Sequence, residues 1–254
     1  MNVFFSDLDN TLIFSHRHHI PEDKIVVEYI DGKEQSFMTK MTWNSLTNLT
    51  GFTLVPVSTR TETQYFRLIC MQELNPKYAI ICNGGKLLVD GKEDKLWTEE
   101  TNDIFSSSEK SMNQAIRELV RISSGSEGHR PESYMYYTSV ESPKKVRSEL
   151  LDVVDLEKVE VYCDSRKVYL FSKRVNKGEA VRRFKSRFDV QDTIAAGDNE
   201  MDIPMLNEVQ LALATEGISL QIITPKIIKL TGDNYSNQIC KALDKYTKAG
   251  VNDD

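Results

Sequence analysis

Two aspartates that close an apolar run are the residues of this chain best suited to chemistry. Asp7 and Asp9 follow the apolar residues 3–5, which predict a short buried strand. Open α/β sheets bind ligands at the carboxyl ends of their strands, and residues two apart in an extended segment point to the same side. Both carboxylates can therefore face one site, where a cation or a shared proton must offset their mutual repulsion.

Three further segments, in a fixed order, add the groups that a phosphoryl site needs. An apolar run over 52–57 ends at a hydroxyl, a helical pattern opens at a lysine, and a small apolar strand over 193–196 leads into two more carboxylates. These groups are Ser58, Lys177, Asp198 and Asp202. Carboxylates and phosphate oxygens are hard ligands that suit Mg2+. A lysine and a hydroxyl can neutralise and orient the other oxygens of a phosphoryl group.

Taken together, the four motifs resemble those of the haloacid dehalogenase superfamily of phosphatases. They read Asp7-x-Asp9-x-Thr11, Ser58, Lys177 and Gly197-Asp198-x-x-x-Asp202, and they lie in the first and last thirds of the chain. The stretch between the second and third motifs resembles the large α/β cap of the Cof-type branch, which includes sucrose-phosphate and mannosyl-3-phosphoglycerate phosphatases. The resemblance implies an α/β protein with a doubly wound, mostly parallel sheet and an inserted α/β cap domain.

The activity implied by the resemblance is Mg2+-dependent hydrolysis of a small phosphomonoester, a phosphosugar being the first candidate, through an aspartyl-phosphate intermediate. Asp7 would be the nucleophile, Asp9 the general acid and base, and Lys177 the cation that holds Asp7 and the phosphoryl group. The implied phosphate-binding residues are Ser58, Thr59 and Lys177. Asn83 follows a predicted core strand at the junction with the insert, where it could contact the substrate or simply form a turn. The implied metal ligands are Asp7, Asp9 through its backbone carbonyl, Asp198 and Asp202. Thr11 would fix the loop.

The chain departs from the usual family pattern at three positions. Met201 stands where the fourth motif of the Cof type usually has asparagine, and Asn199 is a candidate to supply the missing amide. Asn10 and Thr59 stand where glycine is common. Neither of these two is expected to touch a catalytic group, so we expect changes in rate rather than loss of activity.

Composition argues against nucleic acid and membranes as binding partners. A net charge of −6 argues against nonspecific binding to nucleic acid, because phosphate backbones select basic surfaces. No apolar run approaches the roughly 20 residues of a membrane span, which predicts no membrane partner. The four cysteines lie far apart without metal-ligand spacing, which predicts reduced thiols in a cytoplasmic protein. The expected partner is a small phosphate ester, and the oligomeric state stays open.

Periodicity predicts the domain organisation. Residues 1–85 and 173–254 are expected to form the catalytic core, and residues 86–172 the inserted cap. Within the insert, helical stripes over 112–120 and 144–154 predict a sheet with two helices. A separate hairpin pattern over 25–38 predicts either a small flap over the site or an extension of the sheet edge.

Several features keep two interpretations. His16, His18 and His19 could bind a metal, although a solvated loop is the favoured reading. Tyr134, Tyr136 and Tyr137 could line a sugar-binding surface, although a half-buried strand explains them more simply. Arg60 is expected to anchor its helix rather than bind phosphate. For the whole chain, the alternatives are a phosphomutase of the phosphomannomutase type and a noncatalytic protein that binds a phosphorylated ligand.

Overall fold

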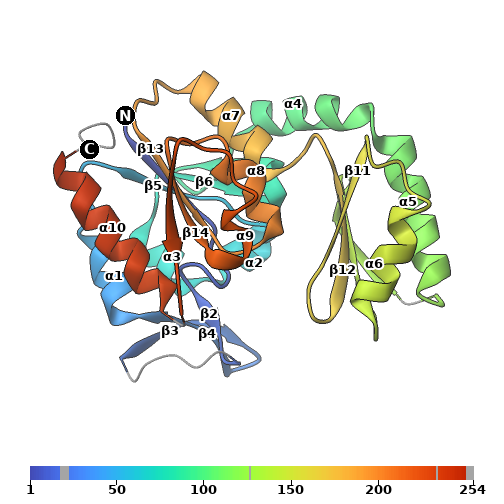
Figure 1. Ribbon diagram of the computed structural model, residues 1–254, viewed down its shortest axis with the longest axis horizontal. Coiled ribbons are helices and arrows are strands. Elements are labelled where there is room, and N and C mark those ends of the chain that lie inside the picture. The colour runs from blue at the N-terminus through green and yellow to red at the C-terminus, as the bar shows by residue number, and fades with distance from the viewer. Residues whose placement is uncertain (18–22, 126, 233, 250–254) are drawn as a thin grey trace. The chain divides into compact units, whose positions relative to one another are not determined.

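Five parallel strands form the centre of the fold, in the order β15-β14-β13-β1-β5 (Figure 1). Their bounds are β1 (Val3–Ser6), β5 (Thr53–Pro56), β13 (Thr193–Gly197), β14 (Leu211–Thr215) and β15 (Lys226–Leu230). The chain passes from β1 outward to β5, and later returns to β13 and passes outward in the other direction. This reversal is a topological switch point, and ligands of open α/β sheets bind at its carboxyl edge.

The computed structural model describes residues 1–17, 23–125, 127–232 and 234–249. It divides the chain into two compact units, one of residues Met1–Glu93 and Lys177–Asp254 and the other of residues Asp94–Asn176. The central sheet lies in the first unit. Among the described helices, none has both the length and the hydropathy that crossing a membrane requires. All four cysteines are free thiols, and three of them are buried.

Helices cover both faces of the central sheet (Figure 1). Helices α1 and α10 pack side by side on one face, and α7 packs with α8 on the other. Their bounds are α1 (Lys40–Thr47), α10 (Tyr235–Ala249), α7 (Lys177–Arg187) and α8 (Ile203–Leu206). Strand β1 is buried throughout, and the ring of Phe5 meets that of Phe184 on α7 edge to face at 5.5 Å. This packing fixes the carboxyl end of β1 relative to the first residue of α7.

Two small antiparallel sheets complete the first unit, in the orders β2-β4-β3 and β6-β7-β8. Their strands are β2 (Phe14–Ser15), β3 (Lys24–Ile30), β4 (Lys33–Thr39), β6 (Tyr78–Ile81), β7 (Lys86–Val89) and β8 (Lys92–Glu93). The interpretation of the 25–38 hairpin as an extension of the main sheet edge is wrong, because β3 and β4 pair with β2 in a sheet of their own. The short helices α2 (Glu62–Phe66) and α3 (Ile69–Leu74) lie between the strands β5 and β6.

The second unit is an antiparallel sheet, β11-β12-β10-β9, with α5 and α6 packed against β11 and β12. Its elements are α4 (Lys95–Ser106), α5 (Glu109–Ile122), β9 (Gly128–Glu132), β10 (Met135–Ser139), α6 (Pro143–Leu151), β11 (Val159–Cys163) and β12 (Lys167–Ser172). The prediction of two helices is wrong, since the described part of this unit has three. Only Trp97, Thr101 and Phe105 are buried on α4, so its apolar stripe is thin and includes a threonine. Tyr134 and Tyr136 are buried, as the structural interpretation predicts.

Gly178 permits the close approach of α7 to α8. A Cβ atom at this position would lie 2.5 Å from the backbone oxygen of Pro204, closer than real side chains come. We predict that Gly178→Ala lowers the free energy of unfolding by about 1–3 kcal/mol, because the two helices must move apart. Urea denaturation measures this change. Gly217→Ala on α9 (Glu216–Ser219), where nothing lies within 4 Å of the added methyl, is the matched control and should not destabilise.

Candidate active site

A buried lysine between two aspartates forms the centre of the candidate site. Lys177, the first residue of α7, has a side chain that is only 1% exposed. Its Nζ donates to Asp7 Oδ1 and to Asp202 Oδ1, each at 2.5 Å. Burial disfavours the ammonium, but the two carboxylates outweigh burial and raise the pKa of Lys177. The three side chains therefore form one charged group inside the protein.

The topology explains why these three residues meet. Asp7 follows β1, and Asp202 ends the short helical turn after β13, so both lie at the switch point of the sheet. The Oδ2 atom of Asp202 accepts the backbone N–H groups of Asp198 and Asn199, at 3.0 and 3.2 Å. A Cβ at Gly197 would lie 2.4 Å from the Cβ of Asp202, so glycine is required for this approach.

Asp198 is held beside this group by the loop after β1. Its Oδ1 accepts the hydroxyl of Thr11 at 3.2 Å and the side-chain amide of Asn199 at 3.3 Å. The backbone N–H of Met201 donates to Asn199 Oδ1, which orients that amide. The side-chain amide of Asn199 thus donates to Asp198, in a chain where Met201 stands at the position at which an asparagine is usual.

The carboxylates of Asp7, Asp198 and Asp202 suit a divalent cation. One oxygen of each lies within 4.8 Å of the others, and within the described part of the chain Asp7 Oδ2 is buried without a hydrogen-bond partner. Burial and the carboxylates of Asp202 and Asp9 raise the pKa of Asp7, against the opposing charge of Lys177. Burial and the carboxylates of Asp202 and Asp7 raise the pKa of Asp198. Donors already engage both oxygens of Asp202. Asp7 and Asp198 therefore have the capacity to ligate a hard cation such as Mg2+.

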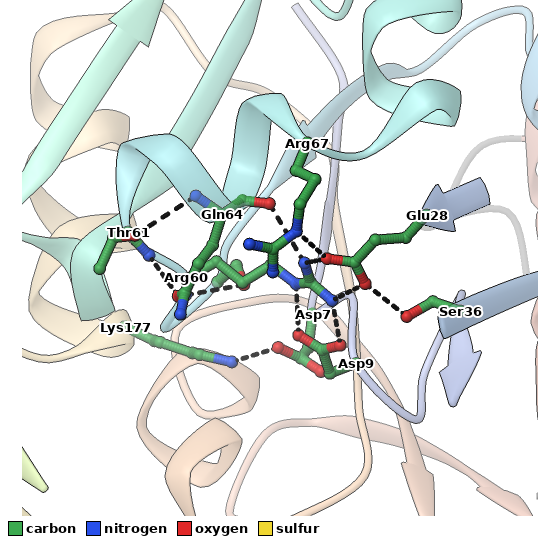
Figure 2. A network of polar contacts seen from close by, with 10 residues as sticks. Asp7, Asp9, Glu28, Ser36, Arg60, Thr61, Gln64, Arg67 and Lys177 are labelled. Carbon is green, nitrogen blue, oxygen red and sulfur yellow. Dashed lines mark hydrogen bonds and ion pairs between the residues drawn. The ribbon is translucent and has the colours of Figure 1, made fainter. Parts of the chain in front are cut away.

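Asp9 belongs to a second charged network, centred on Arg60 (Figure 2). The Nε and Nη2 atoms of Arg60 donate to the two carboxylate oxygens of Asp9, both at 2.8 Å. Nη1 and Nη2 donate to the two oxygens of Glu28, at 2.9 and 3.0 Å, and Nη1 also donates to the backbone oxygen of Gln64 at 3.1 Å. These bonds use all five N–H donors of the guanidinium. Arg60 is thus tied to α2, as the anchoring interpretation predicts, and also to two carboxylates.

Glu28 on β3 is the buried end of this network. Besides Arg60, it accepts the Nε–H of Arg67 at 2.7 Å and the hydroxyl of Ser36 at 2.5 Å, and its side chain is 1% exposed. Burial alone would raise the pKa of Glu28, but the hydrogen bonds and charge of Arg60 lead the opposing effects and lower it to about 2. Sequence analysis does not identify Glu28 or Arg67 as neighbours of the site.

Apart from Lys177, the predicted phosphate-binding residues lie around the turn after β5. Ser58 is fully buried, and its Oγ accepts the backbone N–H of Arg60 at 3.2 Å. The N–H of Asn83 donates to the backbone oxygen of Ser58 at 3.0 Å, which brings Asn83 to the same turn. Asn83 is buried and has a left-handed backbone, with φ of 57°. Within the described residues, no hydrogen bond of the Thr59 side chain joins it to the other candidates.

Two remaining sequence features have simple structural outcomes. Asn10, at a position where glycine is common, has a φ of 64°, a conformation that asparagine tolerates better than most residues. The substitution is therefore compatible with the tight turn after Asp9. His16 is exposed, while His18 and His19 lie outside the described residues, so the histidine cluster carries no assignment.

Comparison with known proteins gives one family and a set of related folds. A sequence profile of the haloacid dehalogenase-like hydrolases matches residues 4–243. The structure is similar to the sucrose-phosphatase of Synechocystis sp. PCC6803 in complex with sucrose and phosphate, with a TM-score of 0.63 and 14% identity over 96% of this chain and 97% of that one. No curated protein sequence matches the chain.

Two further structures show the same likeness. A sugar phosphatase of haloacid dehalogenase subclass IIB has a TM-score of 0.65 and 13% identity over 99% of this chain and 100% of that one. The trehalose-6-phosphate phosphatase of Aspergillus fumigatus has a TM-score of 0.54 and 13% identity over 96% and 92% of the two chains. At these identities the structures establish a shared fold. The predicted α/β class, with a parallel central sheet, is confirmed.

The raised pKa values of Asp7 and Asp198 predict how Mg2+ and pH act together. Between the ordinary pKa of 3.8 and the raised values of about 7 and about 8, both carboxyls hold protons in the folded protein that the unfolded chain has already lost. Stability without Mg2+ therefore falls as pH rises through this range and is lowest above about 8. A Mg2+ ion bound by these carboxylates would displace the protons and offset the loss, by about 3 kcal/mol at a hundredfold excess over its Kd. We expect thermal unfolding to show a larger Mg2+-induced rise in Tm at pH 8 than at pH 6.

The matched variants are Asp198→Asn and Asp90→Asn. The first should lose most of the Mg2+-induced rise in Tm, because a carboxylate ligand becomes an amide. The second makes the same change at an exposed turn and should behave as the wild type. An unchanged Mg2+ response in Asp198→Asn would contradict the assignment.

Proposed function

Because the chain belongs to the haloacid dehalogenase-like hydrolases, we propose that it is a Mg2+-dependent phosphatase that hydrolyses a small phosphate monoester through an aspartyl-phosphate on Asp7. One observation carries this proposal. The carboxylate of Asp7 is buried, with Oδ1 fixed by the ammonium of Lys177 and Oδ2 without a partner in the described structure. A carboxylate held in this way is suited to attack phosphorus, because its orientation is fixed before the substrate binds.

In the first step, an oxygen of Asp7 forms a bond to phosphorus while the bond from phosphorus to the ester oxygen breaks. Asp9 gives a proton to the departing oxygen, which leaves as an alcohol. In the second step, Asp9 takes a proton from water as that water attacks the phosphoryl group, and free phosphate and the Asp7 carboxylate are restored. Mg2+, held by Asp7, the backbone carbonyl of Asp9 and Asp198, would neutralise charge on the phosphoryl oxygens.

The other proposed roles concern binding. Lys177 would balance the charge of the phosphoryl group while it keeps Asp7 oriented, and Ser58, Thr59 and Asn83 would donate hydrogen bonds to the phosphoryl oxygens. Asp202 supports this arrangement, because one of its oxygens accepts from Lys177 and the other from the loop after β13. We propose that Asp202 acts through these contacts and through the water around the metal.

We propose a sugar phosphate as the substrate class. Three proteins of similar structure are a sucrose-phosphatase, a sugar phosphatase and a trehalose-6-phosphate phosphatase, which supports this choice by analogy. The unit of residues 94–176 would serve as the cap that recognises the leaving group. The four free thiols support a reducing compartment such as the cytoplasm, and the net charge of −6 supports a partner other than nucleic acid.

Substitution of the nucleophile tests the proposal. Asp7→Asn should abolish release of phosphate from p-nitrophenyl phosphate and from a panel of sugar phosphates, because an amide cannot attack phosphorus. Asp31→Asn, the same change at an exposed turn, is the control and should keep full activity. Circular dichroism verifies that both variants are folded. Activity of Asp7→Asn within about tenfold of the wild type, roughly 1.4 kcal/mol of barrier, would refute the role of Asp7.

A further inference from the structure

Arg60 has no N–H left to offer a substrate. Its five donors are divided between Asp9, Glu28 and the backbone oxygen of Gln64. An arginine this close to a phosphoryl site would ordinarily be a candidate for a bidentate bond to phosphate. Here Asp9 and Glu28 occupy the guanidinium, so Arg60 acts on these two carboxylates and not on the substrate.

The two ends of this network differ in their freedom to move. The side chain of Glu28 is 1% exposed and is fixed by Ser36 and Arg67 in addition to Arg60. The side chain of Asp9 is 46% exposed, and Arg60 accounts for the hydrogen bonds described for its carboxylate. Any rearrangement of the network therefore begins with Asp9, while Glu28 and Arg60 stay in place.

The proposed chemistry requires such a rearrangement. To act as an acid, Asp9 must carry a proton on one carboxylate oxygen and present it to the ester oxygen. Both oxygens of Asp9 accept hydrogen bonds from Arg60 in the structure, and these two bonds fix the direction of the carboxylate. At least one of these bonds must break before Asp9 can give its proton away.

We propose that Glu28 is a positioning residue that shares the guanidinium of Arg60 with Asp9 and thereby lets Asp9 detach to protonate the leaving group. This inference rests on the proposed phosphatase function. When Asp9 leaves, Arg60 keeps its two bonds to Glu28 and its bond to Gln64, so the cation stays paired. Without the charge of Glu28, Asp9 would be the only carboxylate paired with Arg60 and would be held in the bound position.

The step that depends on this detachment is the formation of the aspartyl-phosphate. An Asp7 oxygen bonds to phosphorus, the bond from phosphorus to the ester oxygen breaks, and the proton of Asp9 moves to that oxygen. A leaving group that is stable as an anion, such as p-nitrophenolate, hardly needs the proton. An alkoxide such as that of benzyl phosphate needs it, and general acid catalysis is typically worth about 10²–10⁴-fold.

The test compares kcat/KM for benzyl phosphate and p-nitrophenyl phosphate, in the presence of Mg2+, for the wild type and Glu28→Gln. The parameter kcat/KM reports the first step, because it covers events up to release of the leaving group. We expect Glu28→Gln to lower kcat/KM at least about tenfold for benzyl phosphate and less than about threefold for p-nitrophenyl phosphate. A general loss of structure would lower kcat/KM for both substrates by the same factor.

Ser36→Ala is the matched control, because it removes one hydrogen bond from Glu28 and keeps the charge. It should leave the ratio of the two substrates within about threefold of the wild type. The positioning role would be overturned if Glu28→Gln is folded, by circular dichroism, and changes kcat/KM for the two substrates by the same factor or leaves both values unchanged. Wild-type protein that hydrolyses neither ester would instead overturn the proposed function, and this inference with it.

Arg67→Gln keeps the inference falsifiable if Glu28→Gln does not fold. Arg67 is partly exposed and donates to the same Glu28 oxygen as Arg60 Nη1. Its removal leaves more of the Glu28 charge to Arg60, so detachment of Asp9 becomes easier and kcat/KM for benzyl phosphate should rise relative to p-nitrophenyl phosphate. An unchanged or lower ratio would contradict the proposal.

Discussion

The ammonium of Lys177, buried between Asp7 and Asp202, is the interaction on which the rest of the site depends. Charges withdrawn from water are costly unless each is paired and hydrogen-bonded, so the fold must hold all three groups closely. It does so by ending β1 and β13 side by side, by starting α7 at the lysine, and by leaving no side chain at Gly197. The chemistry proposed for Asp7 follows from this constraint, since its carboxylate is oriented without help from substrate.

Two charged networks meet at the carboxyl edge of the sheet, and their charge balance differs. Arg60 and Arg67 offset Asp9 and Glu28, so that network is neutral and complete within the protein. Lys177 alone faces three carboxylates, which leaves an excess of two negative charges in a buried place when all three are ionised. The first network is thus suited to positioning a side chain, and the second to binding a cation together with a phosphoryl group.

The sequence predicts those parts of the fold and site that depend on local patterns. Apolar runs ending in polar residues identify the strand ends that carry Asp7 and Asp198, and the family resemblance of the four motifs implies the parallel sheet. Glu28 is different, because a shift of register in β3 between Val26 and Tyr29 turns its side chain inward against the alternation of the strand. Strand β9 is not predicted for a different reason: it lies at a sheet edge and consists of polar residues, glycine and proline, which carry no apolar alternation.

The central claim is that Asp7 becomes phosphorylated and that Asp9 handles the protons around it. Asp9→Asn, mixed with p-nitrophenyl phosphate and Mg2+ and quenched in acid, tests this claim most directly by mass spectrometry. The amide cannot activate water, so the account predicts an added phosphoryl mass on the peptide that contains Asp7. A phosphoryl group on another peptide, or wild-type turnover by this variant, would contradict the account.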